Sequence, residues 1–426
     1  MPLKNPLRSI QARLSAARER HRTRHSASGF QFLLSDSIGF LRPDHWDFVT
    51  GGRRFFLRRP VLEAIERHRP ENLSPRYALI YRDGTPVAAM AAQMIEISGS
   101  QVLGPSKSGE TKLLRKAASV PARRLAARIG QRALIAGNAM SWGFDGVAFA
   151  PDTDPATAWG GVAEALYRIR RADQLNGPTD LVLVKDITPS EPHAEALRSY
   201  SYRPLETEPN MVLTLDPGWR SYEDYLGALD AKYRRNARDQ VKKLAEAGCV
   251  IEPIAEVGAY GSELHRLYKS VQGQATVKLV SVPPTYLPAL AEAAPQDVRC
   301  SVVRRGDDLL GFISTIRDGE TAIGYYIGFD REVASTGVPL YLRLLHTTVA
   351  DAIGWGCRRL SLGRTALEPK AALGAKPETM SVWLRHRNPA VNWLVRGLLD
   401  AVPHAEPPDR NPFKGEKTPK ALQPGS

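Results

Sequence analysis

The chain has 426 residues, of which 43% are hydrophobic and 24% charged, and its formal net charge is +13. This length allows two ordinary domains, and the composition is that of a globular protein rather than a disordered one. We find no apolar run of membrane-spanning length and no apolar signal-peptide core, which predicts a cytoplasmic protein. Cys249, Cys300 and Cys357 are odd in number and widely spaced, so we expect buried free thiols and neither disulfides nor a metal site.

Residues 1–28 form a basic leader. Residues 1–25 hold seven Lys or Arg and one Glu, and apolar residues recur there at helical spacing. The members of that stripe are Leu3, Leu7, Ile10, Leu14 and Ala17. Such a helix would lie on an anionic membrane surface, and the alternative is a frayed leader without a fixed role. We favour the frayed leader, and peripheral attachment at the inner face of the membrane stays open as the alternative.

The first globular region is predicted over residues 29–217. Residues 77–96 read as two strands joined at Asp83-Gly84, a strong hairpin signal. The following elements are expected in this order: a helical stretch at Leu113–Ile129, a strand at Ala133–Ala139, a helix at Ala156–Leu175 and a buried strand at Asp180–Ile187.

The second region is predicted over residues 218–400, with a disordered tail at 401–426 that is rich in Pro, Lys and Gly. Tyr222 to Leu244 reads as one helix that ends at Gly248. A strand at Val250–Ile254, a helix, a three-stranded meander over Cys300–Asp330, a helix at Pro339–Trp355 and further strands follow. Because this order repeats that of the first region, we expect a duplicated α/β fold in which each copy has a mixed sheet flanked by helices.

One stretch resembles a known family. Lys232-Tyr-Arg-Arg-Asn236, its helix and the Ala-Gly-Cys-Val strand entry are similar to the start of the catalytic half in the FemAB-like group of GNAT acyltransferases, which includes BioF2-like acetyltransferase domains. The resemblance implies two tandem GNAT-like domains that transfer an acyl group from acyl-CoA or acetyl-CoA to an amine, without a metal. The amine would belong to a small molecule or a cell-wall precursor. Two alternatives stay open: an aminoacyl-tRNA-dependent ligase of cell-wall precursors, and a non-catalytic protein that binds a glycan or lipid precursor.

The resemblance also suggests where the donor binds. GNAT enzymes hold donor phosphates on amides at the start of the helix after the meander, which here follows Arg331–Pro339. Thr336 and Gly337 are the expected phosphate contacts, although the family's usual glycines are mostly missing. In the first copy, Asp152 and Asp154 stand at the equivalent place and would repel phosphate, so we expect the donor in the second copy.

Several residues are candidates for proton transfer and substrate binding. Acyl transfer to an amine needs a base and an acid, and the candidates in the second copy are Tyr326, Asp330, Glu368 and Lys370. Tyr325 and Tyr326 are expected on opposite faces of their strand. The substrate-binding candidates are Gly363, Arg364 and Thr365, which match a family signature, together with Arg234, Arg235 and Asn236; a solvated helix face is the alternative for the arginines. Residues at similar places in the first copy are Asn138, Trp142, Asp145, Lys185 and Asp186.

Overall fold

The computed structural model describes residues 15, 18, 19, 22, 26–52, 54–97, 132–272, 280–392, 408 and 410–415. The chain divides into two compact units. Unit 1 consists of Met1–Gly52, Glu71–Glu206 and Ser381–Pro403, and unit 2 consists of Arg53–Pro70, Thr207–Met380 and His404–Ser426. The chain passes between the units within β7 (Arg203–Thr214) and β13 (Lys376–His386). The units therefore interleave along the sequence, whereas we expected them to follow one another with a division after residue 217.

Unit 1 is built on a sheet with the strand order β1-β2-β3-β4-β6-β13, and β5 pairs with β3. β4 and β6 are parallel neighbours, whereas β2 and β3 form the antiparallel hairpin predicted at Asp83-Gly84. The elements of unit 1 are β1 (Gln31–Ser35), η1 (Ile38–Phe40), α2 (Pro43–Thr50), β2 (Leu73–Arg82), β3 (Thr85–Glu96), β4 (Arg132–Ala136), β5 (Val147–Phe149), α7 (Pro155–Ala172), η3 (Asp173–Asn176), β6 (Leu181–Ile187) and η4 (Pro192–Tyr200).

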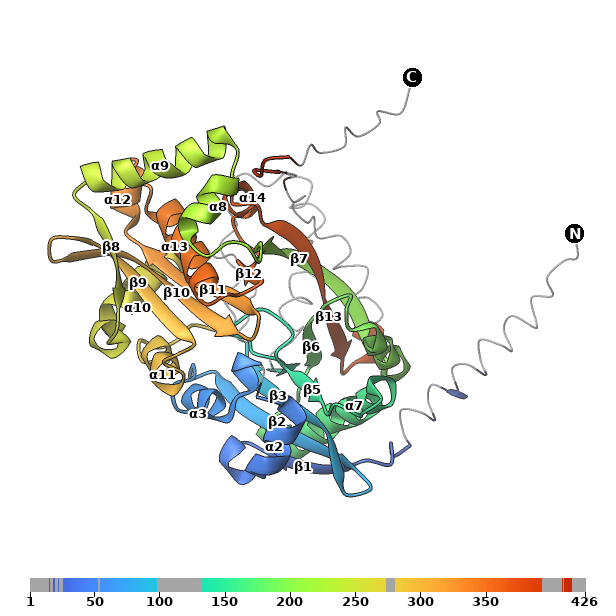
Figure 1. Cartoon of the computed structure of the whole chain (residues 1–426). Helices are drawn as coiled ribbons and strands as arrows, with labels where there is room; N and C mark the ends of the chain where they lie inside the picture. The colour runs from blue at the N-terminus through green and yellow to red at the C-terminus, as the bar shows by residue number, and fades with distance from the viewer. Residues whose placement is uncertain are drawn as a thin grey trace, which may run out of the picture. The chain divides into compact units, whose positions relative to one another are not determined.

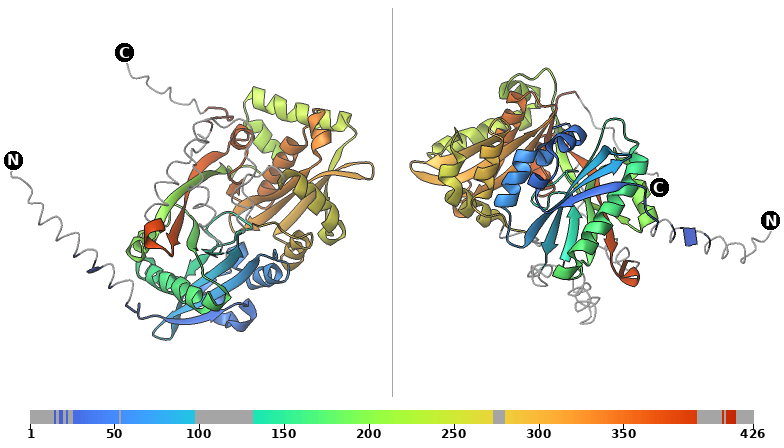
Figure 2. Two further views of the ribbon diagram at one scale, coloured as in Figure 1. Left: turned by 180° about the vertical axis from the view of Figure 1, so that it is seen from behind. Right: turned by 90° about the horizontal axis from the view of Figure 1, so that it is seen from below.

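Helices cover both faces of the unit 1 sheet (Figures 1 and 2). Ala78 and Ile80 point to one face and belong to a core that includes Trp159 of α7. Tyr77 points to the other face, where its ring meets Trp46 of α2 edge-on at 5.9 Å. Successive side chains of a strand point to opposite faces of the sheet. Since the centre of β2 has almost no polar residue, β2 is buried on both faces.

Unit 2 repeats this design with the strand order β7-β12-β11-β10-β9-β8. β9, β10 and β11 form the predicted meander, and β11 and β12 are parallel neighbours. The elements of unit 2 are η2 (Phe55–Leu57), α3 (Arg59–Arg67), α8 (Tyr222–Ala228), α9 (Ala231–Glu246), β8 (Val250–Ile254), η5 (Val257–Tyr260), α10 (Gly261–Gln272), α11 (Tyr286–Ala293), β9 (Val298–Arg305), β10 (Asp308–Asp318), β11 (Thr321–Phe329), α12 (Arg331–Ser335), α13 (Leu340–Gly354), β12 (Arg359–Ser361) and α14 (Leu367–Ala372).

The unit 2 sheet also separates two apolar layers. Phe312 packs in the layer formed with α10 and α11, while its neighbour Ile313 packs in the larger layer formed with α8, α9 and α13. Gly328 on β11 lets α10 approach closely, because a Cβ there would lie 2.4 Å from the backbone carbon of Leu267. In both units three antiparallel strands lead, past β5 in unit 1 and α12 in unit 2, to a helix and then to a strand parallel to the third, so the predicted α/β class is confirmed.

The structure corrects three predictions about the second region and the tail. The helix predicted from Tyr222 to Leu244 is broken at Leu229 and Asp230 into α8 and α9. At the break the backbone is extended and pairs with another segment: Leu229 forms a bridge with Phe413, and the Asp230 amide donates to the Pro412 carbonyl at 2.8 Å. Val241, which we placed on the buried stripe, is 47% exposed. Residues 410–415 were expected in a disordered tail, but Phe413 packs its ring on Trp219 and Tyr225, which ties this segment to unit 2.

Other predictions meet the structure as follows. The three cysteines are free and buried, as predicted. The helical stretch predicted at Leu113–Ile129 lies outside the described residues, as do most of the leader and most of the tail. Within the described part of the chain, no helix combines the length and apolar character that crossing a membrane requires.

Candidate functional site

The first feature of the site is the point at which β11 and β12 part. Their parallel pairing starts at Thr321 and ends at Ile323, which is opposite Ser361. β11 then runs on to Phe329, whereas the chain after Ser361 stays with β7, because the Met211 amide donates to the Gly363 carbonyl at 3.1 Å. Beyond Ile323 the edge of β11 is therefore no longer paired with β12, and an extended ligand could take that place.

The second feature is a β-bulge on β11. Ile313 pairs with Ile327 and Thr315 pairs with Gly324, so Ser314 alone stands opposite both Tyr325 and Tyr326. The Ser314 hydroxyl accepts from the Tyr326 amide at 3.0 Å and donates to the Tyr326 carbonyl at 3.2 Å.

The bulge corrects the prediction that Tyr325 and Tyr326 point to opposite faces. The extra residue shifts the alternation by one, and the two rings stack with centroids 4.2 Å apart. The Tyr325 hydroxyl lies 2.9 Å from that of Tyr286, and the Tyr326 ring lies 5.1 Å from that of Tyr268. Burial, followed by the neighbouring tyrosines, raises the pKa of both Tyr325 and Tyr326 well above the usual range. Tyr326 is therefore protonated at neutral pH and suits the role of an acid rather than a base.

The segment predicted to bind phosphate is folded differently from our expectation. Asp330 caps the short helix α12 by accepting from the Val333 amide at 3.1 Å. Thr336 and Gly337 lie at the end of this helix and not at the start of the next one. The Thr336 hydroxyl donates to the Val333 carbonyl at 2.7 Å, and the Gly337 amide donates to the Ala334 carbonyl at 3.1 Å. These groups are already bonded within the segment, which leaves them less suited to a phosphate.

The equivalent helices of the two units begin differently. α7 of unit 1 is capped by Asp154, whose carboxylate accepts from the amides of Ala156 at 3.1 Å and Thr157 at 3.2 Å. α13 of unit 2 begins after Pro339, and no side chain caps it. Because a carboxylate occupies the first-turn amides and repels other anions, α13 is the better of the two for binding a phosphate.

Two proton-transfer candidates lie on α14 in contrasting surroundings. Glu368 is exposed and pairs with Arg410 at 2.7 Å, as a solvated surface group does. Lys370 is only 3% exposed, and burial lowers its pKa from 10.5 to about 7. Among the described residues, no hydrogen bond or ion pair of its ammonium group is found. Lys370 is therefore the candidate whose pKa suits a base at neutral pH.

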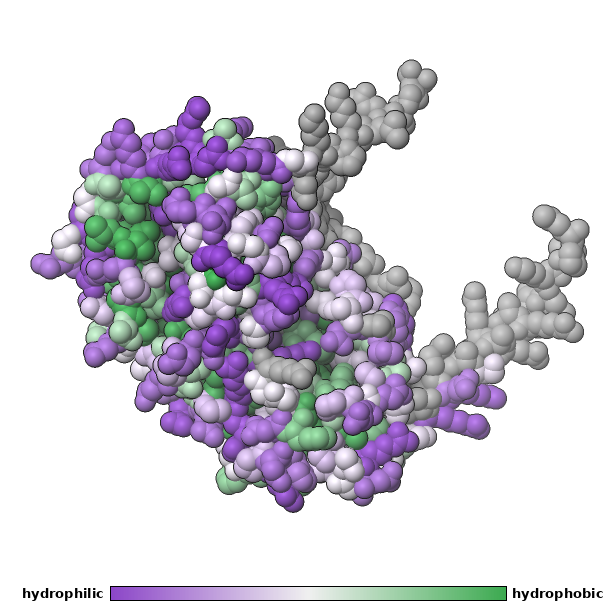
Figure 3. Space-filling view, in the orientation of Figure 1, coloured by the Kyte–Doolittle hydropathy of each residue, from purple (hydrophilic) through white to green (hydrophobic). Residues whose placement is uncertain are grey.

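The remaining predicted residues of unit 2 have mixed surroundings. Arg234 donates to the Leu229 carbonyl at 2.7 Å and thereby joins α9 to the end of α8. The Asn236 side chain accepts from Gln240 at 2.5 Å. Arg235 is exposed on the outer side of α9, where hydrophilic side chains gather (Figure 3).

Gly363, Arg364 and Thr365 follow the parting of β11 and β12. The Gly363 amide donates to Asn210 at 3.0 Å, and its φ of +77° favours glycine. Arg364 is half-buried, with one guanidinium nitrogen 3.6 Å from the Met380 sulfur, and Thr365 is exposed. Gly363 thus fixes the chain that leaves β11, a role that its spacing alone could not show.

Unit 1 holds a buried polar cluster at the carboxyl ends of β4 and β6. Asp186 is fully buried, accepts from the Gly143 amide at 3.0 Å and pairs with Lys185. Asn138 accepts from Gln93 at 3.4 Å, and its loop, residues 137–146, also carries Trp142 and Asp145. Asp186 has a φ of +59°, which is costly for a residue with a side chain. The sequence placed these residues at similar positions, but the strain at Asp186 has no sequence signal.

Comparisons with known proteins agree with this geometry. Residues 231–371 match the family model described as an acetyltransferase (GNAT) domain. A putative 8-amino-7-oxononanoate synthase 2 from Mycobacterium tuberculosis (strain ATCC 25618 / H37Rv) is 23% identical over 239 residues, which cover 54% of this chain and 31% of that protein. The chain thus spans about a third of the length of the curated relatives that it matches.

Solved structures of low sequence identity are also similar to the chain. FemX has a TM-score of 0.44 and 10% identity, and the match covers 76% of this chain and 90% of FemX. A tandem GNAT protein from the clavulanic acid biosynthesis pathway has a TM-score of 0.46 and 12% identity, and the match covers 84% of this chain and 99% of that protein. The strands β11 and β12, which part in unit 2, lie within residues 231–371, the stretch that matches the acetyltransferase (GNAT) domain.

Proposed function

We propose that unit 2 transfers an acyl group from an acyl-CoA thioester to an amine. The observation that carries this proposal is the contrast between the two equivalent helix starts. α7 is closed by the Asp154 carboxylate, whereas α13 has no side-chain cap. A donor with a pyrophosphate group would therefore be held in unit 2 by the first-turn amides of α13.

The donor would lie along the edge of β11 beyond Ile323. Its phosphates would contact the first turn of α13, near Leu340, rather than Thr336 and Gly337, whose groups are bonded within their own segment. The extended arm of the donor would then pass along the strand edge that β12 leaves. This path would bring the thioester to the bulge at Tyr325 and Tyr326.

The chemistry needs one base and one acid. The amine nitrogen attacks the thioester carbonyl carbon, a C–N bond forms, the C–S bond breaks, and the thiolate leaves. Lys370, with a pKa of about 7, would take the proton that the attacking amine loses. Tyr326, whose pKa is raised by burial, would donate a proton to the thiolate. The sum is an amide, a free thiol and a proton transferred from amine to thiolate.

A transfer assay tests the proposal. Purified protein is mixed with acetyl-CoA and a panel of amines, and free thiol and acylated amine are both measured. We expect the rate to rise as the pH passes about 7, because Lys370 then loses its proton. Lys370→Met should lower the rate by roughly 100-fold or more, the usual contribution of a general base. Amine-dependent thiol release that is unchanged in Lys370→Met would remove Lys370 from the mechanism.

Aminoacyl-tRNA is the second candidate donor, because the outer side of α9 is strongly basic. Arg235, Arg238, Lys242 and Lys243 of α9 are all exposed. Hydrophilic side chains gather along this helix (Figure 3). If tRNA binds this helix, affinity should fall steeply with salt, since each phosphate contact releases a counterion. Binding of tRNA together with no effect of any acyl-CoA would favour this donor. If the chain shows neither tRNA binding nor an effect of any acyl-CoA, a non-catalytic binding protein is favoured.

A further inference from the structure

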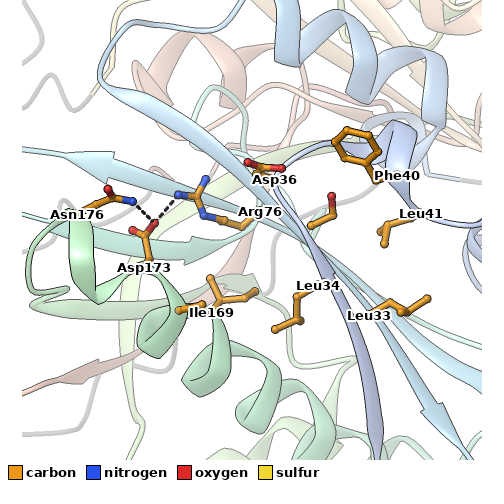
Figure 4. A pocket seen from close by; sticks show the side chains of 11 residues that line it. Leu33, Leu34, Asp36, Phe40, Leu41, Arg76, Ile169, Asp173 and Asn176 are labelled. Atoms are coloured by element: carbon orange, nitrogen blue, oxygen red, sulfur yellow. Dashed lines mark hydrogen bonds and ion pairs between the residues drawn. The ribbon is translucent and has the colours of Figure 1, made fainter.

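Unit 1 carries an exposed apolar groove that the proposed reaction does not use. The groove has a volume of about 520 Å³ and lies between η1, the edge strand β1 and the end of α7 (Figure 4). One end is polar and closed by an ion pair between Arg76 and Asp173 at 2.6 Å. Apolar side chains line most of the rest, namely those of Leu33, Leu34, Phe40, Leu41 and Ile169, and Asp36 lies near Phe40.

Two strongly exposed apolar side chains belong to the elements around this groove. Phe40 on η1 is 82% exposed, and Leu175 on η3, next to the groove residue Asn176, is 98% exposed. Among the described residues, six of the eight exposed large apolar side chains belong to unit 1. They are Leu33, Leu34, Phe40, Phe48, Tyr167 and Leu175. Three of them, Leu33, Leu34 and Phe40, line the groove itself, and such a group of neighbouring exposed apolar side chains marks an interaction surface.

The basic leader joins the molecule beside this groove. The Ser28 amide donates to the Glu164 carboxylate of α7 at 2.8 Å, which anchors the end of the leader to the helix that lines the groove. Arg168 binds the same carboxylate and stacks on Phe32 of β1, with its guanidinium carbon 4.7 Å from the ring centroid. Residues 1–25 carry seven basic side chains and one acidic one, a local charge of +6. Strong positive charge and exposed apolar groups therefore meet on one unit.

We propose that this face of unit 1 docks on an anionic lipid bilayer. Phe40 and Leu175 enter the interface between headgroups and acyl chains, and the groove between them accepts an acyl-chain end. The leader supplies the attraction for the negative headgroups, whose potential acts on basic residues within about 10 Å of the surface at moderate salt. Neither signal alone gives firm attachment, whereas an apolar contact and a basic segment together do.

Vesicle flotation with the full chain tests this proposal. The vesicles contain phosphatidylcholine alone or an equal mixture of phosphatidylcholine and phosphatidylglycerol. We expect binding to the mixed vesicles that falls as salt increases, and at least tenfold weaker binding of the Phe40→Ser, Leu175→Ser double variant. The Arg18→Glu, Arg22→Glu double variant should bind the mixed vesicles more weakly than the parent does. Its binding to vesicles of phosphatidylcholine alone should not change. The matched control is Val241→Ser with Val250→Ser, two exposed apolar residues of unit 2, which should bind like the parent.

Three results with vesicles, and one of oligomeric state, would overturn the proposal. The first three are no binding to mixed vesicles, equal binding of the Phe40→Ser, Leu175→Ser variant and the parent, and equal binding to the two kinds of vesicle. A parent that is dimeric, and becomes monomeric in that variant, would show that the face binds a second copy of the chain instead. Both side chains are exposed, so unchanged melting temperatures establish that the variants fold. Acetyl transfer to a soluble amine should be unaffected, which separates failure of this proposal from failure of the proposed function.

Discussion

Replacing Lys370 by Met should stabilise the protein while it slows the proposed reaction. Burial lowers the pKa of Lys370 from 10.5 to about 7, a difference of about 3.5 pH units. At about 1.4 kcal/mol per unit, the lysine costs about 5 kcal/mol of folding free energy below pH 7. The unfolded chain binds the lysine proton more tightly than the folded chain does. The cost therefore shrinks as the pH rises from 7 toward 10.5, and at pH 10 it is below about 1 kcal/mol.

Urea denaturation of the parent and of Lys370→Met at a series of pH values measures this difference. We expect the variant to gain several kcal/mol at pH 6 and little at pH 10. Lys242→Met, at an exposed lysine that pairs with Glu246, is the control and should show no such pH dependence. The reasoning would be refuted if Lys370→Met were as stable as the parent, or less stable, at pH 6. A gain that did not change with pH would show that Lys370 carries no proton that folding displaces.

Two further changes test the packing of unit 2. Gly328→Ala should lower the free energy of unfolding, measured by urea denaturation, by about 1–3 kcal/mol, because the new methyl group would overlap the α10 backbone. The control is Gly258→Ala, where a methyl group would meet open space, and its effect should be near zero. Equal effects of the two changes would contradict the close packing at Gly328. Burial disfavours the charge on Asp297, but hydrogen bonds from Arg58 and Arg317 hold its pKa below the usual value. Asp297→Asn should therefore lower the melting temperature at pH 7, and the difference from the parent should shrink as the pH falls below about 4; a difference that persists there would contradict this account.

Local patterns predicted most of the regular elements correctly. The Asp83-Gly84 turn identified the β2–β3 hairpin because two adjacent residues with positive φ are rare outside such turns. The meander and the helix at 340–354 were visible from turn residues and apolar periodicity. The bulge at Tyr325 and Tyr326 was not, because it arises from pairing with Ser314 on another strand, and a strict two-residue alternation gave the wrong face.

The long-range features of the candidate site had no sequence signal. The segment at residues 53–70 belongs to unit 2 because Asp318 accepts from the Phe55 amide at 2.6 Å and α3 packs with α11, contacts that span more than 200 residues of sequence. In the same way, Glu368 and Lys370 are two residues apart, yet only the structure shows that one is exposed and the other buried. Sequence patterns therefore identified the candidate residues, whereas the structure is needed to separate their roles.

The most direct test of the central claim is the melting temperature of the chain with acetyl-CoA. At about 100 times its dissociation constant, the donor should add about 2.7 kcal/mol to the free energy of unfolding. Pro339→Asp places a carboxylate at the start of α13, as Asp154 does on α7, and should abolish this stabilisation while keeping or raising the stability of the free protein. The control is Ser335→Asp, which adds the same charge on α12. This variant should keep most of the stabilisation by acetyl-CoA. No stabilisation of the parent by any acyl-CoA, or full stabilisation of Pro339→Asp, would contradict donor binding at α13.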